Sequence, residues 1–359
     1  MAAIKLLPTP DQAQSLIATL AHCNAACNWL SSVAWKRKAF RQFDLHKVAY
    51  FEAKAKFGLT AQAVIRSIAK VADAYKLDRK TQRVFRPDAA QPYDERIIRF
   101  TKDGTVNLWT IDGRQTIAMV MGEHQRRLMA YRKGEVDLCR VRGKWYLAAT
   151  CDVPETEEFE AEDWLGVDLG IVSLAADSDG TIHSGANVER IRSKLARRKA
   201  GLQRRGTKAA KRCLRRLAGK ERRFRTHTNH CISKAIVLTA ERTGRGIALE
   251  DLTHIRSRVT ARRGQRSRLH SWAFGQARAF LSYKAKRAGV PLLCVNPRNT
   301  SRECAVCGCI DKRNRVDQAT FLCIRCGHEA HADFNAAVNI RSRALATRAA
   351  VIQPEVLAA

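Results

Sequence analysis

The spacing of apolar residues changes its period along the chain, and each change predicts a different kind of element. Between about residues 12 and 80, apolar positions such as Leu16 and Leu20 recur at three- and four-residue steps. That spacing places apolar side chains on one face of a helix, and no proline interrupts this stretch. We expect several helices here, preceded by a short strand at residues 4–7. The aromatic residues of the stretch are predicted to be core rather than base-stacking residues: Trp29, Trp35, Phe40, Phe43, Tyr50 and Phe51.

A second stretch, residues 92–153, alternates apolar and polar positions with a period of two. Two hairpins are predicted in it, one turning at Asp103-Gly104 and one at Arg142-Gly143. The pattern indicates a small antiparallel β-barrel or sandwich, and the strand at the start of the chain would join it. The predicted boundaries are residues 1–10 and 86–155 for the barrel and 11–85 for a helical insertion.

Acidic residues cluster in one segment, residues 156–163, which we interpret as a domain linker. Beyond it the pattern predicts three antiparallel strands, a basic helix or a helical hairpin bent near Gly206, a strand, a helix, a strand and a final helix. That is the order of a ribonuclease-H-like α/β domain. We assign residues 164–298 and 331–348 to this domain, 299–330 to an inserted cysteine-rich module and 349–359 to a tail. The fold class is thus multidomain α+β.

Three acids stand where a ribonuclease-H-like domain brings carboxylates together. Asp168 lies in the middle of the first strand, Glu250 lies at the end of the fourth, and Asp333 precedes the final helix. Oxygen ligands of this kind suit Mg²⁺ or Mn²⁺, and two such ions about 4 Å apart can promote phosphodiester hydrolysis. Each acid by itself could also be an ordinary strand-end residue or helix N-cap. Asp251 is the neighbouring alternative to Glu250, and we interpret it as a turn residue.

Five of the twelve cysteines fall within residues 304–326. Four of them form two CxxC pairs, each followed by glycine: Cys304, Cys307, Cys323 and Cys326. Four thiolates make a closed tetrahedral site, which is typical of a structural zinc rather than a catalytic one. Cys309 is a competing ligand, His328 and His331 are more distant alternatives, and four buried cysteines without metal are the simplest alternative. The remaining cysteines read as small buried hydrophobic residues: Cys23, Cys27, Cys139, Cys151, Cys213, Cys231 and Cys294.

The net charge of +31 indicates what the protein binds rather than how it folds. Of 65 basic residues 44 are arginine, whose guanidinium pairs with phosphate through two hydrogen bonds, so a nucleic acid is favoured over a membrane surface or a ribosome. The candidate contacts lie in residues 189–225 and 253–270, although a charge run can also be a solvated face. They are Arg197, Arg198, Arg204, Arg205, Arg215, Arg216, Arg262 and Arg263. No apolar run approaches the roughly 20 residues of a membrane helix, and no secretory signal is visible, so we expect a soluble intracellular protein.

Four segments resemble the TnpB family of transposon-encoded proteins, which are relatives of the type V CRISPR effectors. They are residues 166–170 (GVDLG), 248–252 (ALEDL), 300–308 (TSRECAVCG) and 321–340 (FLCIRCGHEAHADFNAAVNI). The combination of motifs in residues 300–340 is highly specific to this family. For residues 11–150 the resemblance depends on the pattern of predicted elements more than on motifs.

The resemblance implies an RNA-guided DNA endonuclease of a transposable element, acting in the prokaryotic cytoplasm. A β-barrel wedge domain would hold a guide RNA derived from the transposon end, and the helical domain would help to recognise a short motif beside double-stranded target DNA. A RuvC-like domain would cut both strands at one site. Asp168, Glu250 and Asp333 match the family's RuvC acids, so Mg²⁺ (or Mn²⁺) and one structural Zn²⁺ are the implied metals. A monomer is favoured.

Three alternatives stay open at this point. A nuclease or transposase on the same fold could act without a guide. A zinc-ribbon regulator could bind nucleic acid without catalysis, in which case metal at the three acids would be irrelevant. A type V CRISPR effector is the third alternative, although such effectors are usually longer chains.

Overall fold

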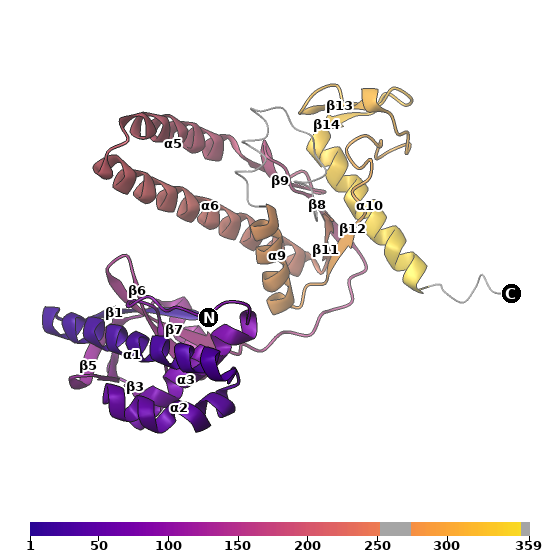
Figure 1. Ribbon diagram of the computed structural model, residues 1–359. Coiled ribbons are helices and arrows are strands. Elements are labelled where there is room, and N and C mark those ends of the chain that lie inside the picture. Colours follow the sequence, from indigo (N-terminus) through magenta and orange to yellow (C-terminus); the bar gives the residue numbers. More distant parts are fainter. Residues whose placement is uncertain (252–273, 353–359) are drawn as a thin grey trace. The chain divides into compact units, whose positions relative to one another are not determined.

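The computed structural model describes residues 1–251 and 274–352 (Figure 1). The protein separates into two compact units, Met1–Val153 and Pro154–Ala359, and each is described by itself. In the described ranges, none of the helices combines the length and the apolar content that crossing a bilayer requires.

Seven antiparallel strands form the body of the first unit and close it into a nearly complete barrel. They are β1 (Ala2–Leu7), β2 (Gln91–Tyr93), β3 (Ile98–Phe100), β4 (Thr105–Thr110), β5 (Gly113–Val120), β6 (Arg132–Val141) and β7 (Lys144–Cys151), with α4 (Glu123–Met129) between β5 and β6. Their order in the sheet is β2-β6-β7-β1-β5-β4-β3. The predicted first strand is confirmed, because β1 pairs with both β5 and β7.

Turn chemistry fixes the two predicted hairpins. Arg142 and Gly143 have φ angles of 55° and 78°, as a two-residue turn between twisted strands requires. Gly104, with φ at 81°, serves the hairpin of β3 and β4. The inward residues of the strands, such as Leu108 and Leu147, form one buried core. The prediction of an antiparallel barrel is therefore confirmed.

Three helices lie between β1 and β2: α1 (Pro10–Arg37), α2 (Gln42–Phe57) and α3 (Ala61–Leu77). A capping box of Thr9 and Gln12 begins α1, with Pro10 at its first position. The three helices pack around their own apolar core. Trp29, Trp35, Phe40 and Tyr50 pack against that core, whereas Phe43 and Phe51 are 68% and 81% exposed, so the prediction that these two are core residues is wrong.

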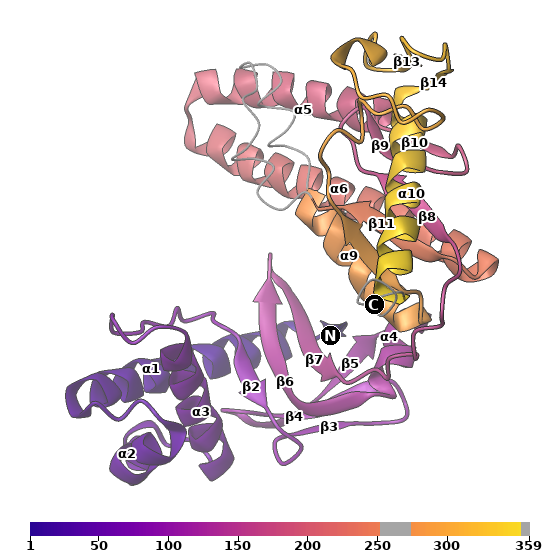
Figure 2. The ribbon, with the colours of Figure 1, turned by 90° about the vertical axis from the view of Figure 1, so that its right-hand side faces the viewer.

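A five-stranded sheet with helices on both faces forms the second unit (Figure 2). Its strands are β8 (Trp164–Asp168), β9 (Ser173–Asp177), β10 (Ile182–Ser184), β11 (Gly246–Glu250) and β12 (Leu292–Val295), in the order β10-β9-β8-β11-β12. The first three strands are antiparallel, and β8, β11 and β12 are parallel. This is the predicted ribonuclease-H-like order.

The two faces of this sheet are covered by different helices. On one face, α6 (Lys208–Thr243) and α9 (Phe274–Ala288) pack Ile236, Ala240 and Leu281 against the sheet. On the other face, α10 (Ala332–Ile352) packs Ile340 and Ala344 against β8, β11 and β12. The strands are apolar on both sides because both faces are covered.

The basic segment is a helical hairpin, which decides between the two predicted alternatives. α5 (Ala186–Arg205) ends at Gly206, whose φ of 62° lies in the left-handed region, and Thr207 caps the start of α6. The second helix of the hairpin is long, and its last part carries the buried Ile236. Figure 1 shows the two helices side by side.

The acidic segment packs on the nuclease-like unit. The backbone N–H of Phe159 donates to the carbonyl of Gly289 at 3.0 Å, and the hydroxyl of Thr156 donates to the carbonyl of Arg287 at 2.9 Å. The segment is thus attached next to the end of α9. These two hydrogen bonds do not define where one domain ends and the next begins, so the domain boundaries given above remain predictions.

Candidate functional site

Two of the candidate acids end neighbouring strands. Asp168 is the last residue of β8 and Glu250 the last residue of β11, and the two strands are parallel with Leu249 opposite Val167. Because the carboxyl ends of parallel strands meet at the same edge of a sheet, the two acids are adjacent. By strand alternation both side chains belong to the face that carries Gly166, which is the face covered by α10.

The third acid arrives on α10, which lies unusually close to β8. A Cβ atom at Gly166 would stand 2.1 Å from the carbonyl oxygen of Ala337 and 2.6 Å from the backbone nitrogen of Arg341. Asp333 lies in the first turn of this helix and is 5% exposed. A glycine in β8 thus allows α10 to approach, and α10 carries Asp333 toward the sheet edge where the other acids lie.

We expect Gly166→Ala to lower the free energy of unfolding by about 1–3 kcal/mol, because the added methyl group overlaps the backbone of α10. Thermal unfolding of the variant and the wild type would measure this. Gly201→Ala is the matched control, since Gly201 lies inside α5 with nothing within 4 Å of the added methyl group, and alanine there should stabilise the helix slightly. Equal melting temperatures for the two variants would contradict the close approach.

The charges of Glu250 and Asp333 influence the pKa of Asp168. Burial, together with the negative charges of Glu250 and Asp333, raises the pKa of Asp168 to about 8. Burial also raises the pKa of Glu250. Carboxylates gathered in this way repel one another, so the ionised site needs a compensating positive charge.

Arg315 supplies part of that charge from the cysteine-rich module. Its guanidinium lies 3.2 Å from Asp333 Oδ1, and its charge counteracts the rise in the pKa of Asp168. The arginine is 25% exposed, so the ion pair is shielded from solvent on most sides. Sequence reasoning missed this residue, because nothing in its local pattern distinguishes it from the other arginines of the module.

Thr300 holds Glu250 from the other side. Its hydroxyl donates a hydrogen bond to Glu250 Oε1 and also lies 3.1 Å from the carbonyl of Pro297. Thr300 is 3% exposed, and its own carbonyl accepts a hydrogen bond from the Asn339 side chain on α10 at 2.9 Å. The threonine therefore fixes the orientation of the Glu250 carboxylate.

Replacing Thr300 with valine removes the hydroxyl and keeps the shape. In the nuclease that the sequence predicts, the cleavage rate of Thr300→Val should fall about 10- to 100-fold, because a hydrogen bond to a charged group contributes about 1.5–3 kcal/mol. Thr300→Ser, which retains the hydroxyl, should restore most of the rate in the same cleavage assay. If serine were as defective as valine, the methyl group rather than the hydroxyl would be what matters.

The cysteine-rich module contains a four-sulfur cluster. The Sγ atoms of Cys304, Cys307, Cys323 and Cys326 all lie within 4.8 Å of one another, with Cys304 and Cys326 at 3.7 Å and Cys307 and Cys323 at 3.5 Å. Among the described residues, these four cysteines are the group whose ligand atoms lie this close together. The oxygen atoms of Asp168, Glu250 and Asp333 are not gathered to the same degree. Four thiols in this arrangement are consistent with a structural zinc.

Two glycines shape the loops that hold the sulfurs. Gly308 and Gly327 have φ angles of 69° and 71°, and their N–H groups donate to the carbonyls of Cys304 and Cys323 at 2.9 Å. Each CxxC segment thus closes into a tight loop that only glycine completes without strain. Cys309 is not part of the cluster, and its backbone carbonyl accepts a hydrogen bond from the N–H of Cys304.

Side-chain amides join the module to α10. Asn335 donates to the carbonyl of Glu303 at 2.7 Å and accepts from the N–H of Ala305 at 3.0 Å, and Asn339 also donates to Glu303. Both asparagines are buried. The short elements of the module are a 3-10 turn (Lys312–Asn314), β13 (Thr320–Leu322) and β14 (Glu329–His331). One packed unit therefore carries Asp333, Arg315 and Thr300.

The basic hairpin presents its arginines to solvent. Six candidate contacts lie on α5 and α6 and are exposed: Arg197, Arg198, Arg204, Arg205, Arg215 and Arg216. Arg212, Arg215 and Arg216 line a surface hollow of about 380 Å³. Arg262 and Arg263 lie outside the described residues. Cys231, also on α6, is exposed, so the prediction that it is buried is wrong.

Comparison with known proteins agrees with this architecture. Residues 148–254 match the family model described as OrfB_IS605, "Probable transposase", and residues 274–340 match the "Cas12f1-like, TNB domain". A TnpB-like protein of Methanocaldococcus jannaschii is 35% identical over 124 residues, which are 34% of this chain and 44% of that one. Over these two stretches the chain is similar to TnpB-like proteins and to proteins with a Cas12f1-like TNB domain. The prediction made from the motifs is confirmed.

Other proteins to which the chain is similar are CRISPR effectors. The CRISPR-associated endodeoxyribonuclease Cas12f1 of Sulfoacidibacillus thermotolerans is 35% identical over 217 residues, which are 55% of this chain and 50% of that one. The chain spans about half the length of the curated relatives that it matches. The Cas12f1–sgRNA–target DNA complex, a cryo-EM structure, has a TM-score of 0.60 at 16% identity and covers 92% of this chain and 81% of that one. The likeness confirms the predicted fold.

Proposed function

We propose that this protein is an RNA-guided DNA endonuclease of a transposable element. Its catalytic residues would be Asp168, Glu250 and Asp333. The single observation that supports catalysis most strongly is the buried sheet edge where the charges of Glu250, on β11, and Asp333, on α10, both act on Asp168, on β8. A regulator that only binds nucleic acid has no use for such an arrangement, which is costly when the carboxylates are ionised.

The residues fit a site for hard divalent cations. The three acids offer oxygen ligands, burial limits access of water, and the raised pKa of Asp168 shows how much the ionised cluster lacks positive charge. Mg²⁺ ions bound there would activate water for attack on a phosphodiester and neutralise the leaving oxygen. Thr300 would orient Glu250, and Arg315, which pairs with Asp333, would place a positive charge beside the bound phosphate.

A guide RNA is the second part of the proposal. One solved structure with the same fold is that of a Cas12f1–sgRNA–target DNA complex. The chain carries a charge of +31, and its exposed arginines gather on the α5–α6 hairpin. A large phosphate surface, as a guide and a heteroduplex provide, accounts for this excess better than a short DNA site does.

Sequencing the RNA that co-purifies with the protein tests the guide directly. We expect one defined RNA, and changing the segment of it that pairs with the target should redirect cleavage to a matching DNA target. Purified protein that cuts DNA after complete removal of RNA would favour the guide-free nuclease instead.

The arginines of α6 should contribute to RNA affinity through phosphate contacts. In a variant with Arg212, Arg215 and Arg216 changed to glutamine, we expect the slope of log affinity against log salt to fall by about 2–3, because each lost phosphate contact is worth about 0.7–0.9. Salt titrations of RNA binding measure the slope. Lys76→Gln is a control, since its charge is already paired with Asp73 at 2.7 Å. An unchanged slope would make this part of α6 a solvated face.

A further inference from the structure

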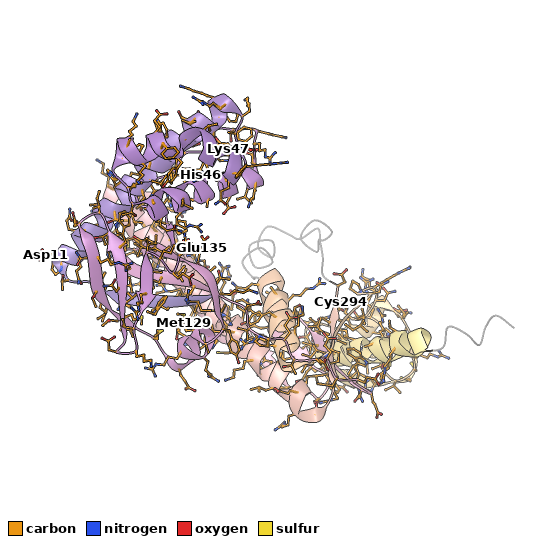
Figure 3. The ribbon with its side chains drawn as sticks, turned by 90° about the horizontal axis from the view of Figure 1, so that it is seen from below. Asp11, His46, Lys47, Met129, Glu135 and Cys294 are labelled. Atoms are coloured by element: carbon orange, nitrogen blue, oxygen red, sulfur yellow. The ribbon has the colours of Figure 1, made fainter. Side chains whose placement is uncertain are left out.

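A hollow in the barrel of the first unit has no role in the function proposed above. Its volume is about 620 Å³, within the range of about 300–1,000 Å³ that is usual for ligand pockets. Three of the four methionines of the chain line it, namely Met119, Met121 and Met129, together with Phe100 and Ile98. Met129, at the end of α4, is labelled in Figure 3.

The hollow lies where the sheet is incomplete. β3, which carries Ile98 and Phe100, is the last strand in the sheet order, and Met119 comes from the end of β5. Phe100 and the three methionines are half-buried and pack against the barrel core. The floor of the hollow is therefore an extension of the core that has no cover of its own. Methionine side chains adapt to a ligand of irregular shape, because they are unbranched and polarizable.

Positive charge surrounds this apolar floor. The Arg132 guanidinium lies 5.4 Å from the centre of the Phe100 ring, and its Nη1 donates to the carbonyl of Gly134 at 3.0 Å. Arg99 is exposed at the rim, and within residues 1–251 and 274–352 no ion pair is found for Arg99 or Arg132. Glu95 at the same rim provides an acceptor oxygen.

These features match the two halves of a nucleotide. An apolar surface with an aromatic ring suits the face of a base, guanidinium groups that form no ion pair among the described residues suit its phosphate, and a carboxylate can accept from an exocyclic amine. A purely apolar ligand would not neutralise the charge of either arginine. A double helix cannot enter, because its bases are stacked and paired, whereas unpaired bases in loops are available for such pockets.

We propose that this hollow binds an unpaired nucleotide of the RNA partner, with the base on Phe100 and the methionines and the phosphate at Arg99 and Arg132. The proposal depends on the function proposed above only in naming the strand as RNA. It adds a site that reads an extruded base and that lies in a different unit from the three acids.

Crosslinking locates the base. The full-length protein is irradiated with a single-stranded oligouridylate of about 15 nucleotides that contains 5-iodouridine, and crosslinked peptides are mapped by mass spectrometry. We expect crosslinks at Phe100 or at the methionines between residues 119 and 129. Crosslinks confined to other parts of the chain would overturn the proposal, and so would stronger crosslinking by the matching deoxyribonucleotide, which would assign the hollow to a DNA strand.

Affinity measurements separate the base from the phosphate. Phe100→Ala should weaken binding of the unmodified oligouridylate about 5- to 150-fold, the range for loss of one base–aromatic stack, and should leave binding of an abasic strand with the same phosphates unchanged. Phe51→Ala, which removes an aromatic ring that is 81% exposed on α2, is the matched control and should have no effect. An equal loss for the abasic strand, or no loss at all, would contradict base binding.

A second variant guards against a folding defect. Phe100→Leu keeps an apolar side chain against the core and removes the ring, so it should retain the melting temperature and still weaken oligouridylate binding. Guided DNA cleavage is measured in parallel. Crosslinks at the hollow without guided cleavage would refute the proposed function and support the nucleotide site. Guided cleavage with no effect of either Phe100 variant on binding would support the proposed function and refute the nucleotide site.

Discussion

Asp168→Ala and Glu250→Ala should each abolish DNA cutting while RNA binding persists. Each acid ends a parallel strand at the same sheet edge, and the two interact electrostatically in a buried site. Loss of either would remove an oxygen ligand from the cations that activate the water, an effect of several kcal/mol, so the cleavage rate should fall by at least about 1,000-fold. Cleavage of a labelled target by the purified protein–RNA complex, with and without Mg²⁺, measures the loss.

Asp251→Ala is the matched control for these variants. Asp251 follows Glu250 directly, but its side chain is half exposed and lies 2.9 Å from Arg278 Nη1. We expect it to cut at nearly the wild-type rate. If Asp168→Ala or Glu250→Ala retained wild-type cutting, or if Asp251→Ala lost as much activity as they do, the assignment of the two acids would be wrong.

Cys304→Ser should lower zinc content and stability together. A structural zinc contributes about 10–16 kcal/mol to the folding of small modules, and the four-sulfur cluster is the site that fits it. The loss should also reduce cutting, because this module carries Thr300 and Arg315 to the acids. Elemental analysis, thermal unfolding and a cleavage assay on the same preparation measure the three effects.

Cys309→Ser distinguishes the four predicted ligands from the fifth cysteine. The Cys309 thiol is outside the cluster, so this variant should retain one zinc per chain and a melting temperature close to the wild type. Retention of zinc by Cys304→Ser, with its loss from Cys309→Ser, would place Cys309 among the ligands.

Elements with a strong local signal could be predicted from the sequence. Both hairpins follow from turns that need positive φ, and β8 and β11 follow from short apolar runs that end in an acid. The four-sulfur cluster follows from the CxxC spacing, because two tight loops each hold a pair of sulfurs.

Features that depend on tertiary packing could not be predicted. Arg315 and Thr300 contact acids far along the chain, and no local pattern marks either residue. The exposure of Phe43 and Phe51 depends on which face of α2 meets its neighbours. The hollow beside Phe100 exists only because β3 is the last strand in the sheet, which is a property of topology rather than of any one segment.

The placement of Asp333 on α10 has a consequence for biosynthesis. The first two acids emerge from the ribosome well before the third, and the cysteine-rich module lies between Glu250 and α10 in the chain. Because α10 also closes one face of the sheet over Gly166, that face stays uncovered until the module and the helix have been made. In the proposed nuclease, a nascent chain would therefore lack the complete set of three acids, and zinc supply during translation would set when it first becomes able to cut DNA.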